Sequence, residues 1–253
     1  MSSIILRTEK LCKSFSNGGV QQHVLKNMDI DIIEGDFTVI MGASGSGKST
    51  LLYSLSGMDQ PSLGKVEFDG TDISKYTNDQ LAVFRRKNCG FVFQSVYLLD
   101  NMSVMDNILT GALVTQKNSK ELIQRVKTLL SQVGLEEKIW SKFPNQLSGG
   151  ESQRVGIVRA IINQPKVVFA DEPTGALNSA SSTDVLDIFT EVNEGGQSIV
   201  MVTHDIKTAI RGNRIIYLKD GYISGELRLG IYKKNNIEDR KEKLQAFLEE
   251  MGW

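Results

Sequence analysis

A glycine-rich octapeptide constrains the fold of this chain more than any other segment. Residues 42–49 have the sequence Gly-Ala-Ser-Gly-Ser-Gly-Lys-Ser, which fits the pattern G-x-x-x-x-G-K-[ST]. A short apolar run at 37–41 precedes it, and a helical pattern from 48 to about 57 follows it. Glycines let backbone N–H groups turn inward around phosphates, and the start of a helix adds its positive dipole end. The segment therefore predicts a phosphate-binding loop between a buried strand and a helix.

Four side chains near this loop and further along the chain have chemistry suited to nucleotide hydrolysis. Lys48 would reach the β- and γ-phosphates, and the Ser49 hydroxyl would ligate Mg²⁺. The apolar run 167–170 ends in Asp171 and Glu172. Asp171 would hold Mg²⁺ at the tip of a strand, and Glu172 would act as general base on the attacking water. Such an acidic pair is often only a solvated turn, but downstream of a phosphate-binding loop it favours hydrolysis.

Composition and charge argue against a disordered chain, a strongly basic nucleic-acid binder and a membrane-spanning protein. The chain has 253 residues, of which 40% are hydrophobic and 23% charged, and these values exclude wholesale disorder. The 29 basic and 30 acidic residues give a net charge of -1, unlike a strongly basic nucleic-acid binder. No apolar run approaches the ~20 residues that span a bilayer, and residues 1–10 lack the apolar stretch of a signal peptide. We expect a soluble intracellular protein with neutral thiols at Cys12 and Cys89.

The order of predicted elements indicates an α/β core split by a mostly helical insertion. Strands are expected at 4–9, 24–33, 37–41, 65–68, 91–94, 167–170 and 198–202, with a hairpin at 214–226, and helices at 48–57, 121–133, 147–162 and 181–193. We predict a mixed-sheet α/β core formed by residues 1–84 and 146–230 and a helical subdomain at 85–145. An amphipathic C-terminal helix is predicted within 231–253, and its apolar face either packs on the body of the protein or binds a partner.

One further motif indicates a family. Residues 147–151 have the sequence Leu-Ser-Gly-Gly-Glu, with Ser148 as an expected helix N-cap. Here the chain resembles the nucleotide-binding subunits of ABC transporters, which are P-loop NTPases with an LSGGQ-like signature. The resemblance continues through Gln94, Asn178 and His204, in the family's order, and covers about residues 4 to 228. A lone His204 would more often be structural and a lone Gln94 a solvated side chain, but four separated motifs in order are far more specific.

The resemblance implies roles for individual residues. Glu172, His204 and Gln94 would be catalytic, and Ser49, Gln94 and Asp171 would hold Mg²⁺. Phe15 stands where the family has an aromatic residue that stacks on adenine, although a core position is the alternative. Together with Phe15, the expected ATP-contacting residues are Gly42, Ser44, Gly45, Ser46, Gly47, Lys48, Ser49, Thr50, Ser148, Gly149, Gly150, Glu151 and Asn178.

The resemblance also implies partners. In ABC ATPases the signature of one subunit closes over ATP held by the P-loop of the other, so we expect a head-to-tail dimer with two ATP molecules at its interface. An integral membrane permease would be the second partner and would hold the chain at the cytoplasmic face of the cell membrane, with no nucleic acid involved.

Within the family, residues 81–86, 89–94, 98–107 and 171–179 resemble the macrolide-exporter, lipoprotein-release and bacitracin-resistance branch. The last stretch, with residues 41–47, is most like the bacitracin and lantibiotic resistance type. That type couples ATP hydrolysis to a separate permease by mechanical transmission, and its substrates are often peptide antibiotics. Two positions depart from the family pattern: Glu151 replaces a common Gln, and Asn178 replaces a common Asp, which puts the coupling between the two ATP sites in doubt.

Two other functions remain open at this point. A soluble ABC ATPase acting on DNA or ribosomes would commonly carry two nucleotide domains, coiled-coil insertions or zinc cysteines, and the sequence has none of these. An ordinary P-loop kinase or GTPase is disfavoured by residues 148–150 and by His204. The ATPase subunit of a membrane transporter is the leading hypothesis.

Overall fold

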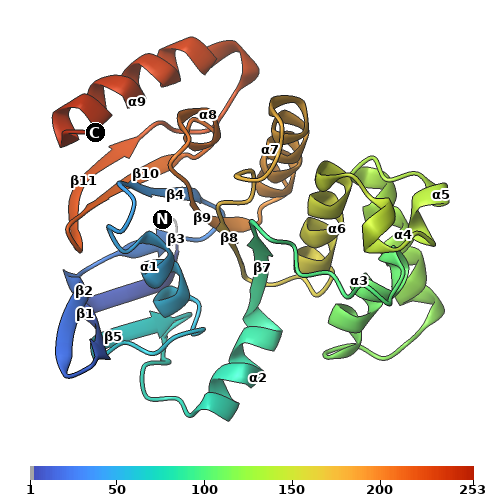
Figure 1. The fold of residues 1–253 in the computed structure, drawn as a ribbon, viewed down its shortest axis with the longest axis horizontal. Helices are drawn as coiled ribbons and strands as arrows, with labels where there is room; N and C mark the ends of the chain where they lie inside the picture. Colours follow the sequence, from blue (N-terminus) through green and yellow to red (C-terminus); the bar gives the residue numbers. More distant parts are fainter. Residues whose placement is uncertain (1–2) are drawn as a thin grey trace.

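The computed structural model describes residues 3–253, and its largest element is a six-stranded sheet (Figure 1). The strand order is β11-β10-β4-β9-β8-β7. These strands are β4 (Phe37–Gly42), β7 (Cys89–Phe93), β8 (Val167–Asp171), β9 (Ser198–Val202), β10 (Arg214–Lys219) and β11 (Tyr222–Arg228). The pairs from β10 to β7 are parallel, whereas β11 runs antiparallel to β10. The parallel strands β4, β8 and β9 are almost wholly buried, as their unbroken apolar sequences require.

A second, antiparallel sheet lies within the blue and cyan part of Figure 1. Its strands are β1 (Ile4–Asn17), β2 (Val20–Met28), β3 (Asp31–Ile33), β5 (Leu63–Phe68) and β6 (Thr71–Asp72), in the order β2-β1-β5-β6 with β3 paired to β1. Helix α1 (Lys48–Leu55) and α2 (Asn78–Asn88) pack with both sheets around one hydrophobic cluster. This cluster supports the loop that connects β4 to α1.

The remaining helices lie around the other face of the six-stranded sheet. They are α3 (Val104–Leu113), α4 (Lys120–Gln132), α5 (Glu137–Trp140), α6 (Gly149–Ile161), α7 (Ser179–Glu194), α8 (Ile206–Ala209) and α9 (Ile237–Met251), with 3₁₀ turns at Pro144–Gln146 and Lys234–Asn236. Figure 1 shows α3 to α6 grouped on the side away from the antiparallel sheet, and α9 beside β11. The group α3 to α6 and the helices α7 and α9 share a second hydrophobic cluster with the six-stranded sheet.

The predicted strand at 24–33 is confirmed in part, because the chain is extended over most of this range but forms two strands, β2 and β3, with a break at residues 29–30. The two strands pair with different stretches of β1. The break is bonded to β1 through the backbone of Thr8 and Ile30. Sequence reasoning also missed α2 and the division of the strands into two sheets, and it gave no bounds for α3 and α5 within the predicted helical segment. Alternation of apolar residues predicts a half-buried strand but does not identify its neighbours.

The segment 85–145 contains the strand predicted at 91–94 as well as helices. It contains the end of α2 and strand β7, which pairs with β8 in the six-stranded sheet, and its own helices start at Val104. Strand β7 begins two residues before the predicted range and ends one residue before its end. The division of the chain into domains remains a prediction.

The predicted helix near the end of the chain is confirmed over Ile237–Met251. Leu244, Phe247 and Leu248 are buried against the body, so the packing alternative holds for this face. Within residues 3–253, no helix combines the length and apolar character needed to cross a membrane.

Candidate active site

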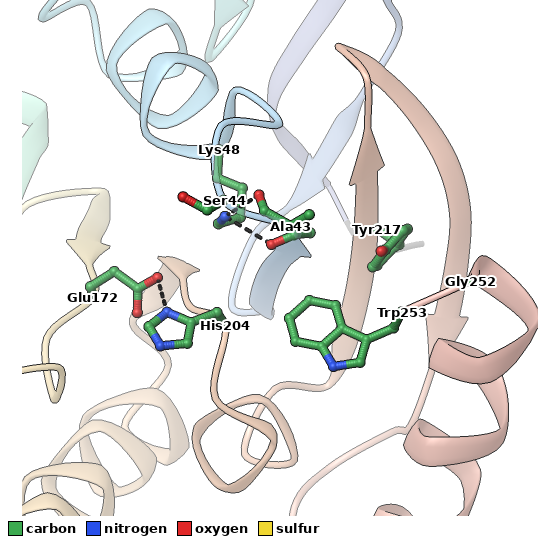
Figure 2. A pocket seen from close by; sticks show the side chains of 9 residues that line it. Ala43, Ser44, Lys48, Glu172, His204, Tyr217, Gly252 and Trp253 are labelled. Atoms are coloured by element: carbon green, nitrogen blue, oxygen red, sulfur yellow. Dashed lines mark hydrogen bonds and ion pairs between the residues drawn. The ribbon is translucent and has the colours of Figure 1, made fainter.

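The carboxyl ends of the parallel strands bring the separated motifs to one edge of the sheet. The glycine-rich loop follows β4, Glu172 follows β8, and His204 follows β9. A cavity of about 530 Å³ opens there (Figure 2). Its lining consists of Gly42, Ala43, Ser44, Lys48, Glu172, His204, Tyr217, Gly252 and Trp253.

Backbone geometry fixes the loop between β4 and α1. Gly42 has φ 151°, and a Cβ at this position would lie 2.2 Å from the carbonyl oxygen of Leu218. No other residue fits there without displacing β10. Gly47 caps α1 and has no side-chain hydrogen bond, so the first N–H groups of the helix remain available to an anion.

Lys48 is the cation of this site. Its side chain is buried, and Nζ donates hydrogen bonds to the carbonyl oxygens of Gly42 (2.8 Å) and Ala43 (2.9 Å). Burial lowers the pKa of Lys48, while the nearby carboxylates of Glu172 and Asp171 act in the opposite direction. The ammonium group is thus held at the loop next to the two acidic residues.

Ser49 and Asp171 form a hydroxyl–carboxylate pair beside the loop. Ser49 Oγ donates to Asp171 Oδ1 at 2.9 Å, although the residues are 122 positions apart in the sequence. Mg²⁺ is usually bound by one or two carboxylates together with substrate phosphates, so this oxygen pair fits a magnesium–nucleotide site.

Sequence reasoning missed Tyr53, which supports Asp171 from the same helix as Ser49. The phenol of Tyr53 donates to Asp171 Oδ2 at 2.8 Å. Burial and this hydrogen bond raise the pKa of Tyr53 to about 12, so the hydroxyl remains a donor at neutral pH. Tyr53 lies four residues after Ser49, so both side chains are on one face of α1. This spacing is the sequence signal that could have predicted the role of Tyr53.

The other predicted loop residues differ in exposure. Ser44 and Gly45 are exposed, Thr50 is partly buried on α1, and Ser46 is buried. Ser46 Oγ has no hydrogen-bond partner among the described residues. A buried hydroxyl without a partner costs free energy, and a phosphate oxygen bound in this loop would satisfy it.

Glu172 and His204 meet at the opposite wall of the cavity (Figure 2). Glu172 Oε1 and His204 Nδ1 are 2.8 Å apart, and the histidine side chain is the more exposed of the two. The backbone N–H of Glu172 bonds the carbonyl of Val202, and its φ is 47°. This strained turn directs the carboxylate into the cavity.

Gln94 follows β7 and is exposed. Its side-chain amide lies against Gly175, where an added Cβ would be 2.9 Å from Gln94 Nε2. The structure therefore brings Gln94 to the loop that follows Glu172, whereas its role toward Mg²⁺ stays a prediction.

The signature residues lie outside this cavity. Ser148 and Glu151 form a capping box at the start of α6, with hydrogen bonds of 2.7 and 3.2 Å between their side chains and backbones. Gly150 packs against Ser181, and Asn178 Oδ1 caps α7 by accepting from Ser181 N–H at 2.9 Å. None of residues 148–151 or 178 lines the cavity that contains Lys48.

Phe15 also lies outside the cavity. Its ring is 44% exposed on β1, so the core alternative is wrong, and Lys13 Nζ lies 5.0 Å from the ring centroid. The neighbouring strand β2 reaches the glycine-rich loop, because Val24 contacts Gly47. Stacking on adenine stays a prediction.

Comparisons with known proteins agree with this geometry. Residues 25–175 match the ABC transporter family. The chain is 45% identical over 224 residues to the lipoprotein-releasing system ATP-binding protein LolD of Aquifex aeolicus, covering 88% of this chain and 97% of LolD. It is 42% identical over 227 residues to the bacitracin export ATP-binding protein BceA of Halalkalibacterium halodurans, covering 89% of each.

A third relative is the macrolide export ATP-binding/permease protein MacB of Aggregatibacter actinomycetemcomitans. Identity is 42% over 219 residues, which cover 87% of this chain but 34% of MacB. Among solved structures, the dimeric structure of the ABC transporter cassette MJ0796 superimposes with a TM-score of 0.83 at 37% identity, covering 90% of this chain and all of that one.

Proposed function

This chain belongs to the ABC transporter family, in the branch of its LolD, MacB and BceA relatives, and we propose that it powers a separate permease for resistance to antimicrobial peptides. At the level of the family, it is an ATP-binding and ATP-hydrolysing subunit that uses Mg²⁺. The observation that carries the reaction is one cavity that joins the phosphate-binding loop and Lys48 to the Glu172–His204 pair.

In this proposal each side chain has one task. Lys48 and the N-terminus of α1 bind the phosphates, and Ser49 and Asp171 hold Mg²⁺, which neutralises phosphate charge when bound. Glu172 orients the attacking water and accepts its proton, and His204 positions the Glu172 carboxylate through the 2.8 Å contact. Gln94 lies at the loop after Glu172, from which it would sense the γ-phosphate.

The test of the reaction is Glu172→Gln. The substitution keeps the shape of the side chain and removes the base, so turnover should fall by about 10²–10⁴-fold while ATP still binds. Glu191→Gln on the exposed side of α7 is the matched control and should hydrolyse ATP at the wild-type rate. Steady-state hydrolysis within threefold of wild type, roughly 0.7 kcal/mol in barrier, would reject this role for Glu172.

A head-to-tail dimer follows from the separation of the two halves of the site. The signature lies outside the cavity of its own chain, so it is available to the nucleotide of a second copy. The related cassette MJ0796 has a dimeric structure. In the Glu172→Gln variant, ATP should shift the chain to a dimer in sedimentation experiments, and ADP should not.

The proposed permease contact lies in residues 95–107, and this contact would hold the chain at the cytoplasmic face of the membrane. Tyr97, Leu99 and Met102 are exposed large apolar side chains. Cysteines at Tyr97 or Leu99 should form crosslinks to the permease, whereas a cysteine at Val20, which is 72% exposed on β2, should not. Absence of crosslinks along the whole segment, with a working positive control, would reject the contact.

The peptide-antibiotic substrate is supported by residues 41–47 and 171–179, which resemble the bacitracin and lantibiotic type, and by the BceA relative. LolD and MacB relatives have similar identities, so lipoprotein release and macrolide export are the competing outcomes. The test is the inhibitory concentration of bacitracin, of a lantibiotic and of a macrolide for cells that carry either the wild-type chain or Glu172→Gln. Loss of resistance to the macrolide alone, or a defect in lipoprotein release alone, would reject the peptide substrate.

A further inference from the structure

One wall of the ATP cavity comes from a residue that no nucleotide motif contains. Trp253 lines the cavity together with Ala43 and Ser44 of the glycine-rich loop and with His204 (Figure 2). Its indole is 47% exposed. On its other side it contacts the Tyr217 ring, with centroids 6.1 Å apart at 71°. A large apolar surface therefore stands at the mouth of a site for charged phosphates.

Helix α9 carries this indole and is anchored at its far end by Arg240. The Arg240 side chain is only 1% exposed, and its guanidinium donates to the carbonyl oxygens of Ile210, Gly212, Leu229 and Gly230 at 2.6–3.0 Å. Two of these acceptors, Ile210 and Gly212, lie directly after α8, the short helix that follows His204. Removal of the guanidinium would leave buried acceptors unpaired, so loss of this anchor would lower the stability of the fold.

The near end of α9 is fixed as closely. A Cβ at Gly225 of β11 would lie 2.7 Å from Met251 Sδ, so the helix packs directly on the strand backbone. Lys219 Nζ donates to the Met251 carbonyl at 3.1 Å, and the Trp253 N–H bonds the Leu248 carbonyl at 2.9 Å. These contacts fix the backbone that carries the indole beside the loop.

We propose that a second copy of this chain covers Trp253 when two copies close on ATP, so that the indole is part of the closing surface. The inference rests on the proposed function, because that function requires a partner to close over the cavity that holds Lys48, Glu172 and His204. Trp253 lines the same cavity, so its exposed face is continuous with the surface that the partner must approach.

Two physical arguments favour a direct contact between Trp253 and the second copy. Tryptophan is among the residues most enriched at interface hot spots, where it is desolvated in a packed pocket. A side chain already fixed by its own chain loses little conformational entropy on binding. Trp253 is held by its contact with Tyr217, and its 47% exposed surface is available for a partner to desolvate. The second tryptophan, Trp140 of α5, is partly buried, and its Nε1 is bonded to the Leu135 carbonyl at 2.9 Å.

The two tryptophans provide matched fluorescence probes in the full chain. Glu172→Gln with Trp140→Phe retains Trp253 alone, and Glu172→Gln with Trp253→Phe retains Trp140 alone. With Mg²⁺ and ATP, quenching of Trp253 by acrylamide should fall about fivefold, which corresponds to burial of an indole now 47% exposed to roughly a tenth. ADP should leave the quenching unchanged, and Trp140 should not respond to either nucleotide.

A signature variant separates the partner from the nucleotide. Ser148→Arg, added to the Trp253 probe, should still bind ATP at its own loop but should not close on a second copy, so the protection of Trp253 should be lost. Equal protection in this variant, with sedimentation showing a monomer, would mean that ATP itself covers the indole and would overturn the inference. A dimer in which Trp253 stays fully quenchable would also overturn it.

Failure of the proposed function would be recognised in the same samples. If ATP produces no dimer of the Glu172→Gln protein, the two-copy site itself is wrong, and the inference falls with it. If a dimer forms, Trp253→Ala should raise the dimer dissociation constant tenfold or more, as hot-spot truncations do. Trp253→Phe should retain part of that affinity.

Discussion

Two helix N-termini in this chain have the sequence of an anion site, yet they are built differently. At α1 the capping residue is Gly47, which has no side-chain cap, and the helix start is buried beside Lys48. At α6 the side chains of Ser148 and Glu151 already bond to the backbone N–H groups of the same turn, and the end is exposed. Open donors next to a cation favour phosphate binding, whereas donors already paired contribute less.

The difference indicates an order of events. The half of the site at the start of α1 (the α1 half) has the Lys48 cation, unpaired backbone N–H donors and the Ser49–Asp171 pair in one place. It should therefore bind nucleotide in a single chain. The α6 half is outside that cavity and carries the carboxylate of Glu151, whose pKa is lowered chiefly by the hydrogen bond from the Ser148 backbone N–H. It should contribute when a second copy closes, through the transition state more than through initial binding.

Loss of the cation should have the largest effect on the α1 half. Lys48→Ala leaves the β- and γ-phosphate charge uncompensated, at a cost of about 2–4 kcal/mol in ATP-binding free energy. Calorimetry on the single chain should therefore give an affinity roughly 30- to 1000-fold weaker than that of wild type. Lys207→Ala, which removes an exposed lysine on α8, is the control and should bind normally. Unchanged affinity for Lys48→Ala would contradict the comparison.

The α6 half should respond in the opposite way. Ser148→Arg blocks approach to the partner's nucleotide, so turnover should fall by about a hundredfold, as when a donor to transition-state charge is removed. ATP affinity of the single chain should stay at the wild-type value, measured by the same calorimetry. A parallel loss of affinity would mean that the signature binds ATP within its own chain.

Tyr53 refines the description of the α1 half. Tyr53→Phe removes the donor to Asp171 Oδ2 without changing the shape of the helix face. Loss of a supporting hydrogen bond to a metal ligand costs about 10-fold in metal affinity or activity, so the Mg²⁺ concentration for half-maximal hydrolysis should rise by that factor. ATP binding without Mg²⁺ should be unchanged. Because the pKa of Tyr53 is raised to about 12, the effect should not vary with pH near neutrality. An unchanged Mg²⁺ requirement would assign Tyr53 a packing role only.

The smallest effect is expected at Asn178, which caps α7, the helix whose Ser181 contacts Gly150 of the signature. Its Oδ1 caps α7, and Asp caps a helix about equally well, so Asn178→Asp should fold with unchanged stability. A charged acceptor makes stronger hydrogen bonds, by about a factor of two. The Hill coefficient for ATP in the permease-bound complex, or the turnover rate, should therefore rise. If neither changes, capping is the whole role of Asn178.

Much of the site followed from local sequence because its parts are local. The glycine-rich loop needs only residues 42–49, and the Ser148 cap needs only a serine with an acceptor three residues later. The apolar runs at 37–41, 167–170 and 198–202 predict strands. The structure pairs these strands in parallel, and their common edge explains why Glu172 and His204 meet. The strand at 24–33 is predicted as one element, because the alternation of its residues does not reveal that the chain breaks at 29–30 and pairs its two parts with different stretches of β1.

By itself the sequence determined the phosphate-binding loop, the acidic pair and the capped signature helix, since these depend on glycine conformations and on hydrogen bonds within a few residues. Only the tertiary structure decided which distant groups support them. Tyr53 reaches Asp171 across 118 positions, and Trp253 reaches the loop because α9 is fixed on β11 and anchored by Arg240. Such contacts depend on packing of whole elements, where an apolar or aromatic residue has no local signal of what it will touch.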